Sequence, residues 1–221
     1  MTNYLDPTVE AILSLGHGVP DDVIAEMDAY GRETNFPTVG PDVGRFLRVA
    51  TLMADAERVF EFGSGFGYSA VWMADALPAQ GEIVLTDYDE ENVDRARTFL
   101  QRAGYEDRAT FHVGDAADAF ENTRGSFDVV LIDHEKRRYV EAFDLVADRL
   151  TPGDIVIADN VLDGPVNPGD VRAGLEGEEP TDETTDGIVS YVQRVRDDPS
   201  VETVVVPLGQ GIAVSVFVES E

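Results

Sequence analysis

The sequence predicts an α/β protein with a mostly parallel, doubly wound sheet and helices on both faces of that sheet. Short apolar runs rich in Val, Ile, Leu and Phe alternate with longer segments whose apolar residues recur at helical spacing. A glycine-rich turn, 63–67, joins the first of these runs to the helical segment behind it. Because strands and helices alternate, the connections are expected to be right-handed crossovers between parallel strands.

The first strand is expected at 58–62, because Arg-Val-Phe-Glu-Phe follows a segment, 42–54, with apolar residues at helical spacing. After the glycine turn, a second helical pattern runs over 68–77. Further strands are expected at 82–87, 109–113, 127–133 and 154–159. The helices that follow the first three of these are expected at 90–103, 115–121 and 135–150.

The C-terminal part departs from this alternation. A helix is expected at 182–196, and then two apolar runs, 201–207 and 212–218, are joined by Leu-Gly-Gln-Gly, which is typical of a hairpin. The last strand of the seven is therefore predicted to be antiparallel. We expect one domain over 1–221, with helical additions in 1–40. The segment 161–187, rich in Gly, Pro, Asp and Glu, is expected to be a long acidic loop over the site.

The composition is strongly acidic. The 221 residues include 44 acidic and 16 basic side chains, which gives a formal net charge of −28. The basic residues are 15 arginines and a single lysine, Lys136. Concentrated salt screens such a charge, so the composition favours a salt-adapted, halophilic protein. Without any cysteine, disulfides, thiolate metal sites and cysteine nucleophiles are excluded.

Composition also bears on partners. The chain has no basic stripe to displace the counterions of a nucleic acid, so no nucleic-acid partner is expected. It also has no apolar run of the roughly 20 residues needed to span a membrane, and its start lacks the basic residues of a secretory signal. The cytoplasm is the expected location, without membrane contact.

Acidic residues stand at the ends of several predicted strands. Glu61, Asp87 and Asp133 end three of them, and Asp159 with Asn160 ends a fourth. In open parallel sheets, ligands bind in the crevice at the carboxyl ends of the strands. These side chains are therefore expected to converge on one ligand site.

The glycine turn and Asp87 together indicate an adenosine cofactor. Glycines let a ligand approach the backbone, and an acidic residue about 20 positions later suits a ribose diol. The alternatives are a purely structural turn and a helix cap at Asp87. NAD is disfavoured, because the third glycine falls one residue early for its motif and Glu61 would lie close to a pyrophosphate. A cationic cofactor suits this acidic site better.

Two carboxylates and an amide oxygen suggest a metal site. Asp133, Asp159 and Asn160 offer hard oxygen ligands, which suit Mg²⁺ or Mn²⁺. The alternatives are a helix cap at Asp133 and a turn at Asp159 and Asn160. His134 is interpreted as a neighbour of this cluster rather than as a ligand.

Three sequence motifs resemble those of a known enzyme family. They are Glu61-Phe-Gly-Ser-Gly-Phe-Gly-Tyr-Ser-Ala-Val71, Leu131-Ile-Asp-His-Glu-Lys-Arg-Arg-Tyr139 and Ala158-Asp-Asn160. They resemble the cation-dependent, S-adenosylmethionine-dependent O-methyltransferases, which include catechol and caffeoyl-CoA O-methyltransferases and their prokaryotic counterparts. The resemblance runs from about residue 37 to residue 218. It implies the Rossmann-like class I methyltransferase fold, in which the last of seven strands is antiparallel, and a possible homodimer.

The resemblance also implies roles for individual residues. The metal ligands would be Asp133, Asp159 and Asn160, and the catalytic base would be Lys136. One departure is Glu135, which stands where catechol O-methyltransferase has a tryptophan against the adenine. The implied cofactor residues are Val39, Glu61, Gly63, Gly67 and Ser69 around the methionine part, Asp87 at the ribose, Asp115 and Ala116 at the adenine, and Asp133.

The predicted chemistry is methyl transfer to a hydroxyl of a small catechol-like acceptor. A divalent cation stabilises a phenolate whose parent phenol, with a pKa of about 10, is poorly ionised at neutral pH. Two vicinal hydroxyls can chelate that cation. Lys136 can lose its proton, which arginine cannot, and this favours it as a base. The alternatives are a metal-independent methyltransferase for another small molecule or a protein, a non-catalytic adenosine-binding module and, third, a Rossmann dehydrogenase.

Overall fold

The structure of the chain is a computed structural model, and it describes residues 7–16 and 21–219. The strands are β1 (Arg58–Phe62), β2 (Glu82–Asp87), β3 (Ala109–Val113), β4 (Val129–Ile132), β5 (Ile155–Ala158), β6 (Val201–Val206) and β7 (Ile212–Phe217). The α-helices are α1 (Pro7–Gly16), α2 (Asp22–Thr34), α3 (Gly40–Met53), α4 (Tyr68–Ala76), α5 (Glu90–Ala103), α6 (Ala116–Asn122), α7 (Tyr139–Ala147), α8 (Pro168–Leu175) and α9 (Glu183–Arg196). Short 3₁₀ helices, η1 (Glu106–Arg108) and η2 (Lys136–Arg138), precede β3 and α7.

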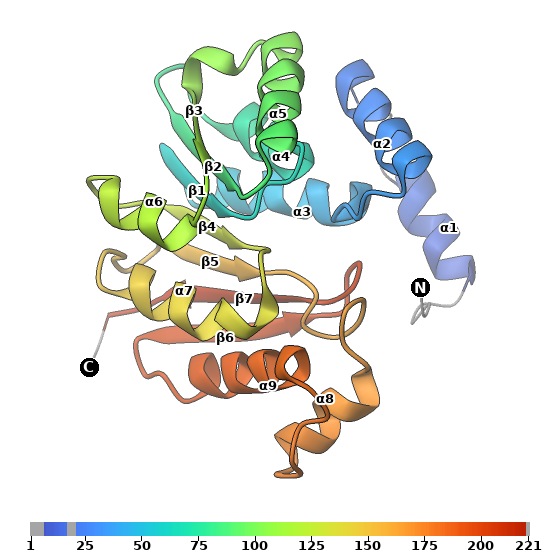
Figure 1. Cartoon of the computed structure of the whole chain (residues 1–221), viewed down its shortest axis with the longest axis vertical. Coiled ribbons are helices and arrows are strands. Elements are labelled where there is room, and N and C mark those ends of the chain that lie inside the picture. Colours follow the sequence, from blue (N-terminus) through green and yellow to red (C-terminus); the bar gives the residue numbers. More distant parts are fainter. Residues whose placement is uncertain (1–6, 17–20, 220–221) are drawn as a thin grey trace.

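The described strands form one seven-stranded sheet in the order β3-β2-β1-β4-β5-β7-β6 (Figure 1). Strands β1 to β5 pair in parallel, and β7 is antiparallel to both of its neighbours, β5 and β6. The chain therefore winds outward from β1 in both directions, and the order reverses between β1 and β4. This confirms the predicted fold class, including the antiparallel last strand.

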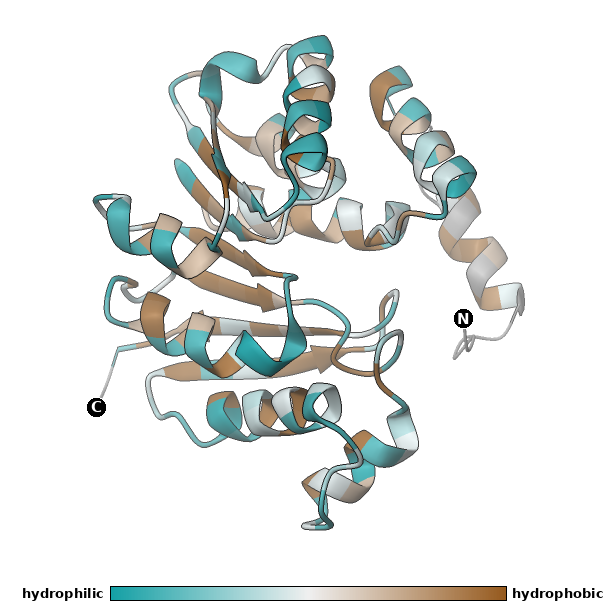
Figure 2. Cartoon of the chain, in the orientation of Figure 1, coloured by the Kyte–Doolittle hydropathy of each residue, from teal (hydrophilic) through white to brown (hydrophobic). Residues whose placement is uncertain are grey.

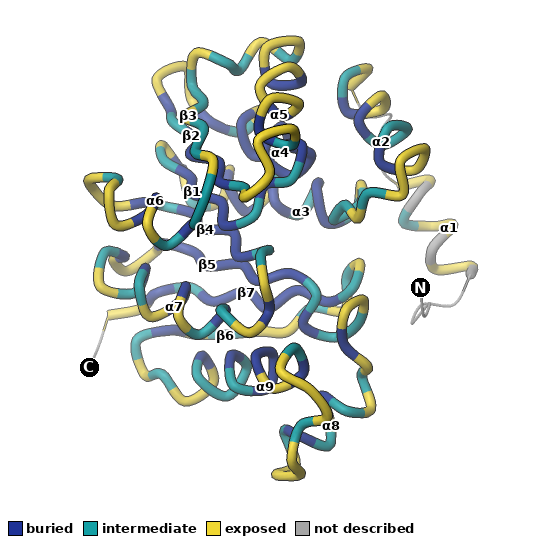
Figure 3. Tube along the Cα trace, in the orientation of Figure 1, coloured by how far each residue is buried: buried dark blue, intermediate teal, exposed yellow. Residues whose placement is uncertain are grey.

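The sheet separates two hydrophobic cores. Consecutive residues of a strand point to opposite faces, and accordingly Val59 belongs to one core and Phe60 to the other. The first core packs against α2 to α5, and the second packs against α6, α7 and α9. The central strands are apolar and buried, whereas the outward sides of α5 and α8 are polar and exposed (Figures 2 and 3).

The expected helical addition at 1–40 contains α1 and α2, and residues 36–39 then lead into α3 as a non-helical segment. Helix α2 is capped by Asp21, whose carboxylate accepts a hydrogen bond from the Val23 backbone N–H at 2.9 Å. An ion pair between Glu26 and Arg102 joins α2 to α5. Residues 1–6 and 17–20 of the expected addition lie outside the described residues. Within the described part of the chain, no helix is both long and apolar enough to cross a membrane.

The expected loop over 161–187 is wrong for its central part, which forms α8. Asn167 caps this helix by accepting a hydrogen bond from the Gly169 N–H at 2.8 Å, and Pro168 occupies its first turn. Both are start signals for a helix, and the many glycines and acids around them obscured the pattern. Val171 is buried, and Gly174 lets α8 lie against the side chain of Val189 on α9.

The helix expected at 135–150 is shorter and begins differently. Glu135 has an extended backbone (φ −63°, ψ 119°) and gives no side-chain cap, so the chain first forms the 3₁₀ turn η2 and only then α7. This turn carries Lys136 and Arg138. It therefore decides where two of the charged side chains near the predicted site can reach.

Candidate active site

A cavity of about 560 Å³ opens at the carboxyl ends of the parallel strands, next to the point where the strand order reverses. This is where open α/β sheets bind their ligands. Its walls come from the segment before α3, the turn after β1, the ends of β2, β4 and β5, and the β6–β7 hairpin. The predicted site residues that line it are Val39, Gly63, Ser69, Asp87, Ala116, Asp133, Lys136, Asp159 and Asn160.

The glycine turn between β1 and α4 forms one wall of the cavity. Gly63 and Gly67 both have left-handed backbones, with φ of 84° and 85°. A Cβ on Gly63 would lie 2.6 Å from the Asp133 carbonyl oxygen, so no larger residue fits between β1 and β4 here. Gly67 itself does not line the cavity; it is in contact with Ala96 of α5. The sequence predicts a cofactor contact for Gly67, whereas its left-handed backbone indicates that it shapes the turn beside α5.

Glu61 lies behind the cavity wall rather than in it. Its side chain is fully buried in β1, where one carboxylate oxygen accepts a hydrogen bond from the Ser69 hydroxyl. The other oxygen, Oε2, is buried without a hydrogen-bond partner. Burial raises the pKa of Glu61 to about 8, although the hydrogen bond from Ser69 lowers it. Ser69 connects this buried acid to the cavity.

Asp87 ends β2 and faces the cavity. Its Oδ2 accepts a hydrogen bond from the Gly65 N–H at 2.9 Å, which ties the glycine turn to this strand. Its Oδ1 accepts from the Asp89 N–H at 2.9 Å and from the Asn92 side-chain amide at 3.1 Å. The cap of α5 is Asp89, which accepts from the Glu91 N–H at 2.8 Å. The helix-cap alternative therefore applies to Asp89 and not to Asp87.

Asp115 does not present its carboxylate to the cavity. It caps α6 by accepting from the Ala117 N–H at 2.8 Å, and it forms an ion pair with Arg138 at 2.6 Å. The hydrogen bond from Arg138 holds the pKa of Asp115 down at about 2. The neighbouring residues Gly114 and Ala116 do line the cavity. Position 115 thus borders the site, but its side chain serves the helix start and Arg138.

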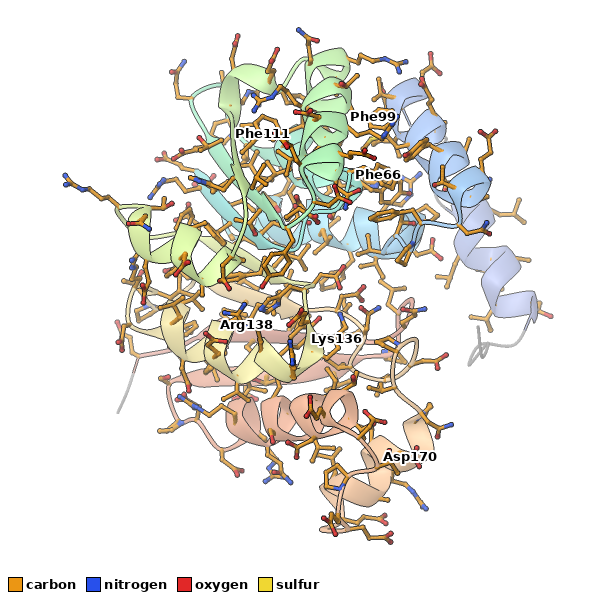
Figure 4. All side chains as sticks on the ribbon, in the orientation of Figure 1. Phe66, Phe99, Phe111, Lys136, Arg138 and Asp170 are labelled. Atoms are coloured by element: carbon orange, nitrogen blue, oxygen red, sulfur yellow. The ribbon has the colours of Figure 1, made fainter. Side chains whose placement is uncertain are left out.

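Lys136 lies in the cavity wall at the beginning of η2, close to Arg138 on the same turn (Figure 4). Its side chain is only 8% exposed. Its Nζ donates hydrogen bonds to Asp133 Oδ1 at 2.9 Å and to the Tyr139 hydroxyl at 2.6 Å. The Tyr139 hydroxyl in turn donates to the backbone carbonyl of Asp159 at 3.0 Å. This chain of bonds links the ends of β4 and β5 through the lysine.

Asp159 and Asn160 follow β5 beside this lysine. Asp159 is 2% exposed, and its Oδ1 is buried without a hydrogen-bond partner. Burial and the nearby Asp133 raise the pKa of Asp159 to about 8, and burial raises that of Asp133 as well. Asn160 has a left-handed backbone (φ 61°), and its side-chain amide nitrogen donates to Gln210. Its amide oxygen is left for another partner.

The described residues contain no group of three or more His, Cys, Asp or Glu side chains arranged to hold a metal. The predicted trio has two carboxylates and one amide, and it is not a group of that kind. His134 is mostly buried, and its ring stacks on Tyr139 at 5.6 Å between centroids. Burial lowers the pKa of His134 to about 4, so the imidazole is neutral near neutral pH.

Several cavity residues carried no role in the sequence-based prediction. Tyr139 belongs to a recognised motif, but only the fold shows its bonds to Lys136 and Asp159. Gln210 was visible only as part of a hairpin turn, and Phe36 to Thr38 only as the approach to α3. The sequence gives little indication that these residues belong to the site, because turn residues and isolated aromatic residues occur throughout the chain.

A doubly wound sheet with a glycine turn, an acid at the end of β2 and a cavity between them is typical of proteins that bind an adenosine cofactor. The sequence model of the family described as O-methyltransferase matches residues 24–217. The chain therefore belongs to the O-methyltransferase family. This confirms the resemblance seen in the motifs and the predicted enzyme class, an S-adenosylmethionine-dependent O-methyltransferase.

Individual relatives agree with this assignment. The chain is 32% identical to a catechol O-methyltransferase of Niastella koreensis over 173 residues, covering 75% of this chain and 78% of that protein. It is 28% identical to caffeoyl-CoA O-methyltransferase 1 of Eucalyptus globulus, covering 80% and 74%. The fold matches an O-methyltransferase from Bacillus cereus, solved in complex with SAH, with a TM-score of 0.83 and 24% identity over 95% of this chain and 97% of that one.

Proposed function

We propose that this chain transfers the methyl group of S-adenosylmethionine to a hydroxyl of a small catechol-like acceptor. In this proposal Asp133, Asp159 and Asn160 hold Mg²⁺ or Mn²⁺, and Lys136 accepts the proton of the acceptor hydroxyl. The observation that carries the proposal is the meeting of these four residues in one cavity, beside the glycine turn.

The cavity suits a cationic adenosine cofactor. When bound, S-adenosylmethionine supplies a methyl group activated by a positive sulfonium. On the protein side, the Gly63 turn leaves the backbone open to a ligand, and Asp87 faces the cavity. The buried, unpartnered Oε2 of Glu61 adds an acceptor behind Ser69. These groups would hold a positively charged ligand better than an anionic dinucleotide.

The cluster at the ends of β4 and β5 suits a hard divalent cation. Asp159 keeps one buried carboxylate oxygen without a partner, and Asp133 lies close enough to raise its pKa. Two neighbouring carboxylates buried in this way repel each other, and a cation would relieve that repulsion. With the amide oxygen of Asn160 they form a set of hard oxygen donors. Such a cation would stabilise an ionised phenol.

The position of Lys136 supports its proposed role in proton transfer. Its Nζ lies in the cavity wall, held between Asp133 and Tyr139, so the amine has a defined position relative to the two predicted metal ligands. General bases need such placement within hydrogen-bond reach of the proton that they take. The neighbouring His134 is turned onto the Tyr139 ring instead.

The proposal can be tested with labelled S-adenosylmethionine and 4-methylcatechol in concentrated salt. We expect methyl transfer that a chelator abolishes and that added Mg²⁺ restores. Binding of S-adenosylmethionine, but not of NAD, should be measurable by calorimetry. Full turnover in excess chelator would indicate a metal-independent methyltransferase. Cofactor binding without transfer to any acceptor would instead favour a binding module.

A further inference from the structure

We infer that the acceptor site selects by charge: it takes neutral or cationic catechols and rejects acceptors that carry a carboxylate or phosphate. This inference rests on the proposed function and names the acceptor class more narrowly. It matters because relatives of this chain include enzymes named for catechol and for caffeoyl-CoA, an acceptor with several phosphate charges.

The first observation is the set of charges around the cavity. Among the described residues, four carboxylates line it, and they belong to Asp87, Asp133, Glu135 and Asp159. No arginine lines it within that part of the chain, and Lys136 is the single lysine of the whole sequence. Glu135 is already paired with Arg137, and the other three acids lie where the cationic cofactor and the divalent cation are proposed to bind.

The second observation is that two of the three N–H groups of Lys136 are already engaged by its neighbours. Its side chain is 8% exposed, and its Nζ already donates to Asp133 and to the Tyr139 hydroxyl. An acceptor carboxylate near it would compete with Asp133 and lie beside Asp159. Lys136 can therefore take a hydroxyl proton without also serving as an anion anchor.

The third observation is that the nearest arginines are engaged with other acids. Arg137 is 59% exposed and pairs with Glu135 at 2.9 Å and with Glu183 at 3.8 Å. Arg138 pairs with Asp115 at 2.6 Å and with Glu141 at 2.7 Å. Neither side chain lines the cavity. The turn η2 thus carries three cations, and each of them is matched by a carboxylate.

An anionic acceptor would therefore bury its charge without a free cationic side chain to pair with it, which is costly. A neutral ring loses nothing of this kind, and the cavity also has apolar lining residues, namely Phe36, Pro37 and Phe66. An ammonium on the acceptor would gain from the acids. Concentrated salt weakens long-range repulsion, but it screens groups in contact inside a cavity much less.

Three acceptors that share the same ring diol provide the test. The kcat/KM for 4-methylcatechol, dopamine and 3,4-dihydroxyphenylacetate should be measured at one fixed, high salt concentration with saturating cofactor. We expect the anionic acid to fall at least about tenfold below the other two, the scale of one unpaired polar group. Equal values for all three would overturn the inference. If no methyl group is transferred to any of the three, the proposed function itself is contradicted.

A gain-of-function variant provides the second arm. Pro165 is an exposed residue at the cavity rim, in the loop after β5. Pro165→Lys adds a cation there, and Pro165→Gln is the matched uncharged control. The readout is the ratio of kcat/KM for the anionic to that for the neutral acceptor, so a general change in activity cancels. We expect this ratio to rise several-fold in the lysine variant only; an unchanged ratio would contradict selection by charge.

Discussion

The neighbours of Lys136 determine where its side chain lies and which carboxylate it pairs with. Asp133 and Glu135 both lie close to Lys136 in the sequence, and the 3₁₀ turn η2 brings the lysine to Asp133, three residues earlier. Glu135 pairs instead with the exposed Arg137. The lysine is thereby held in the cavity wall rather than on the surface.

Replacing this lysine with arginine tests the base. Lys136→Arg keeps the positive charge, but a guanidinium stays protonated and so cannot take the proton of the acceptor hydroxyl. We expect turnover to fall by about 10²-fold or more, the usual scale for a positioned base. Cofactor binding should remain. The matched control, Arg137→Lys on the exposed neighbour, should stay near wild-type turnover.

If Lys136→Arg turns over at the wild-type rate, Lys136 is not the base. In that case the predicted cation alone would have to ionise the acceptor. Single-turnover measurements would separate this outcome from a slow product-release step that hides the chemistry.

Asp159→Ala tests the metal site. It removes the carboxylate with the unpartnered buried oxygen, so methyl transfer should be lost at all Mg²⁺ concentrations. Cofactor affinity should persist, because the glycine turn and Asp87 come from other strands. The melting temperature should change little, because the side chain gives up only the hydrogen bond that it accepts from the Asn160 backbone N–H. Retained turnover in this variant would contradict the assignment of Asp159 as a ligand.

Asp87→Ala tests the cofactor site. Loss of a charged acceptor facing the ribose position should weaken cofactor binding by about 1.5–3 kcal/mol, tenfold or more in Kd. Asp89→Ala is the matched control: it removes the cap of α5 and costs about 1 kcal/mol of stability, but it leaves the cavity intact. Calorimetric titration checks both. Unchanged affinity in a folded Asp87→Ala protein would place the ribose elsewhere.

At the scale of elements, η2 depends on the helix packed behind it. Helix α9 lies against η2 through Gly187, where an added Cβ would come within 2.4 Å of the Lys136 carbonyl oxygen and 2.6 Å of the Arg137 Cα. Both contacts are with backbone, which cannot rotate away. The C-terminal helix thus sets the position of the predicted base, although it lies about 50 residues later in the chain.

Gly187→Ala should therefore shift the base without touching the cavity. A displacement of roughly 1 Å at a reacting group can cost about 10²-fold in rate, so we expect a large loss of kcat with little change in cofactor Kd. Gly16→Ala in α1, where an added Cβ meets nothing within 4 Å, is the control and should leave kcat unchanged. A Gly187→Ala protein that is folded and fully active would show that η2 tolerates the shift.

At the scale of the whole molecule, charge dominates. With a net charge of −28, the acidic side chains repel one another, and low salt screens this repulsion only partly. In about 1 M salt the screening length shortens to about 3 Å. We expect the melting temperature to fall steadily as NaCl drops from molar to tens of millimolar. A sucrose series at low salt controls for general stabilisation by a cosolvent. A melting temperature that does not depend on salt would contradict the halophilic interpretation.

Local patterns determined most of the architecture. The predicted bounds of β1, β2, β3 and α5 match the structure residue for residue, because short apolar runs and helix-cap residues lie in adjacent positions of the sequence. The net charge follows from the composition, and the family was predictable from the three motifs. The antiparallel last strand followed from one hairpin turn. Predictions of location, dimer formation and salt adaptation depend on sequence alone and stay predictions.

Tertiary structure decided which partner each side chain of the site takes. Asp87 could equally have capped a helix, yet Asp89 does so. Asp115 turns from the cavity to Arg138, and Tyr139 bridges Lys136 to β5. One physical reason explains all of these choices of hydrogen-bond partner. A carboxylate or hydroxyl bonds to whatever donor folding brings within about 3 Å, and residues far apart in sequence supply those donors only after the sheet has formed.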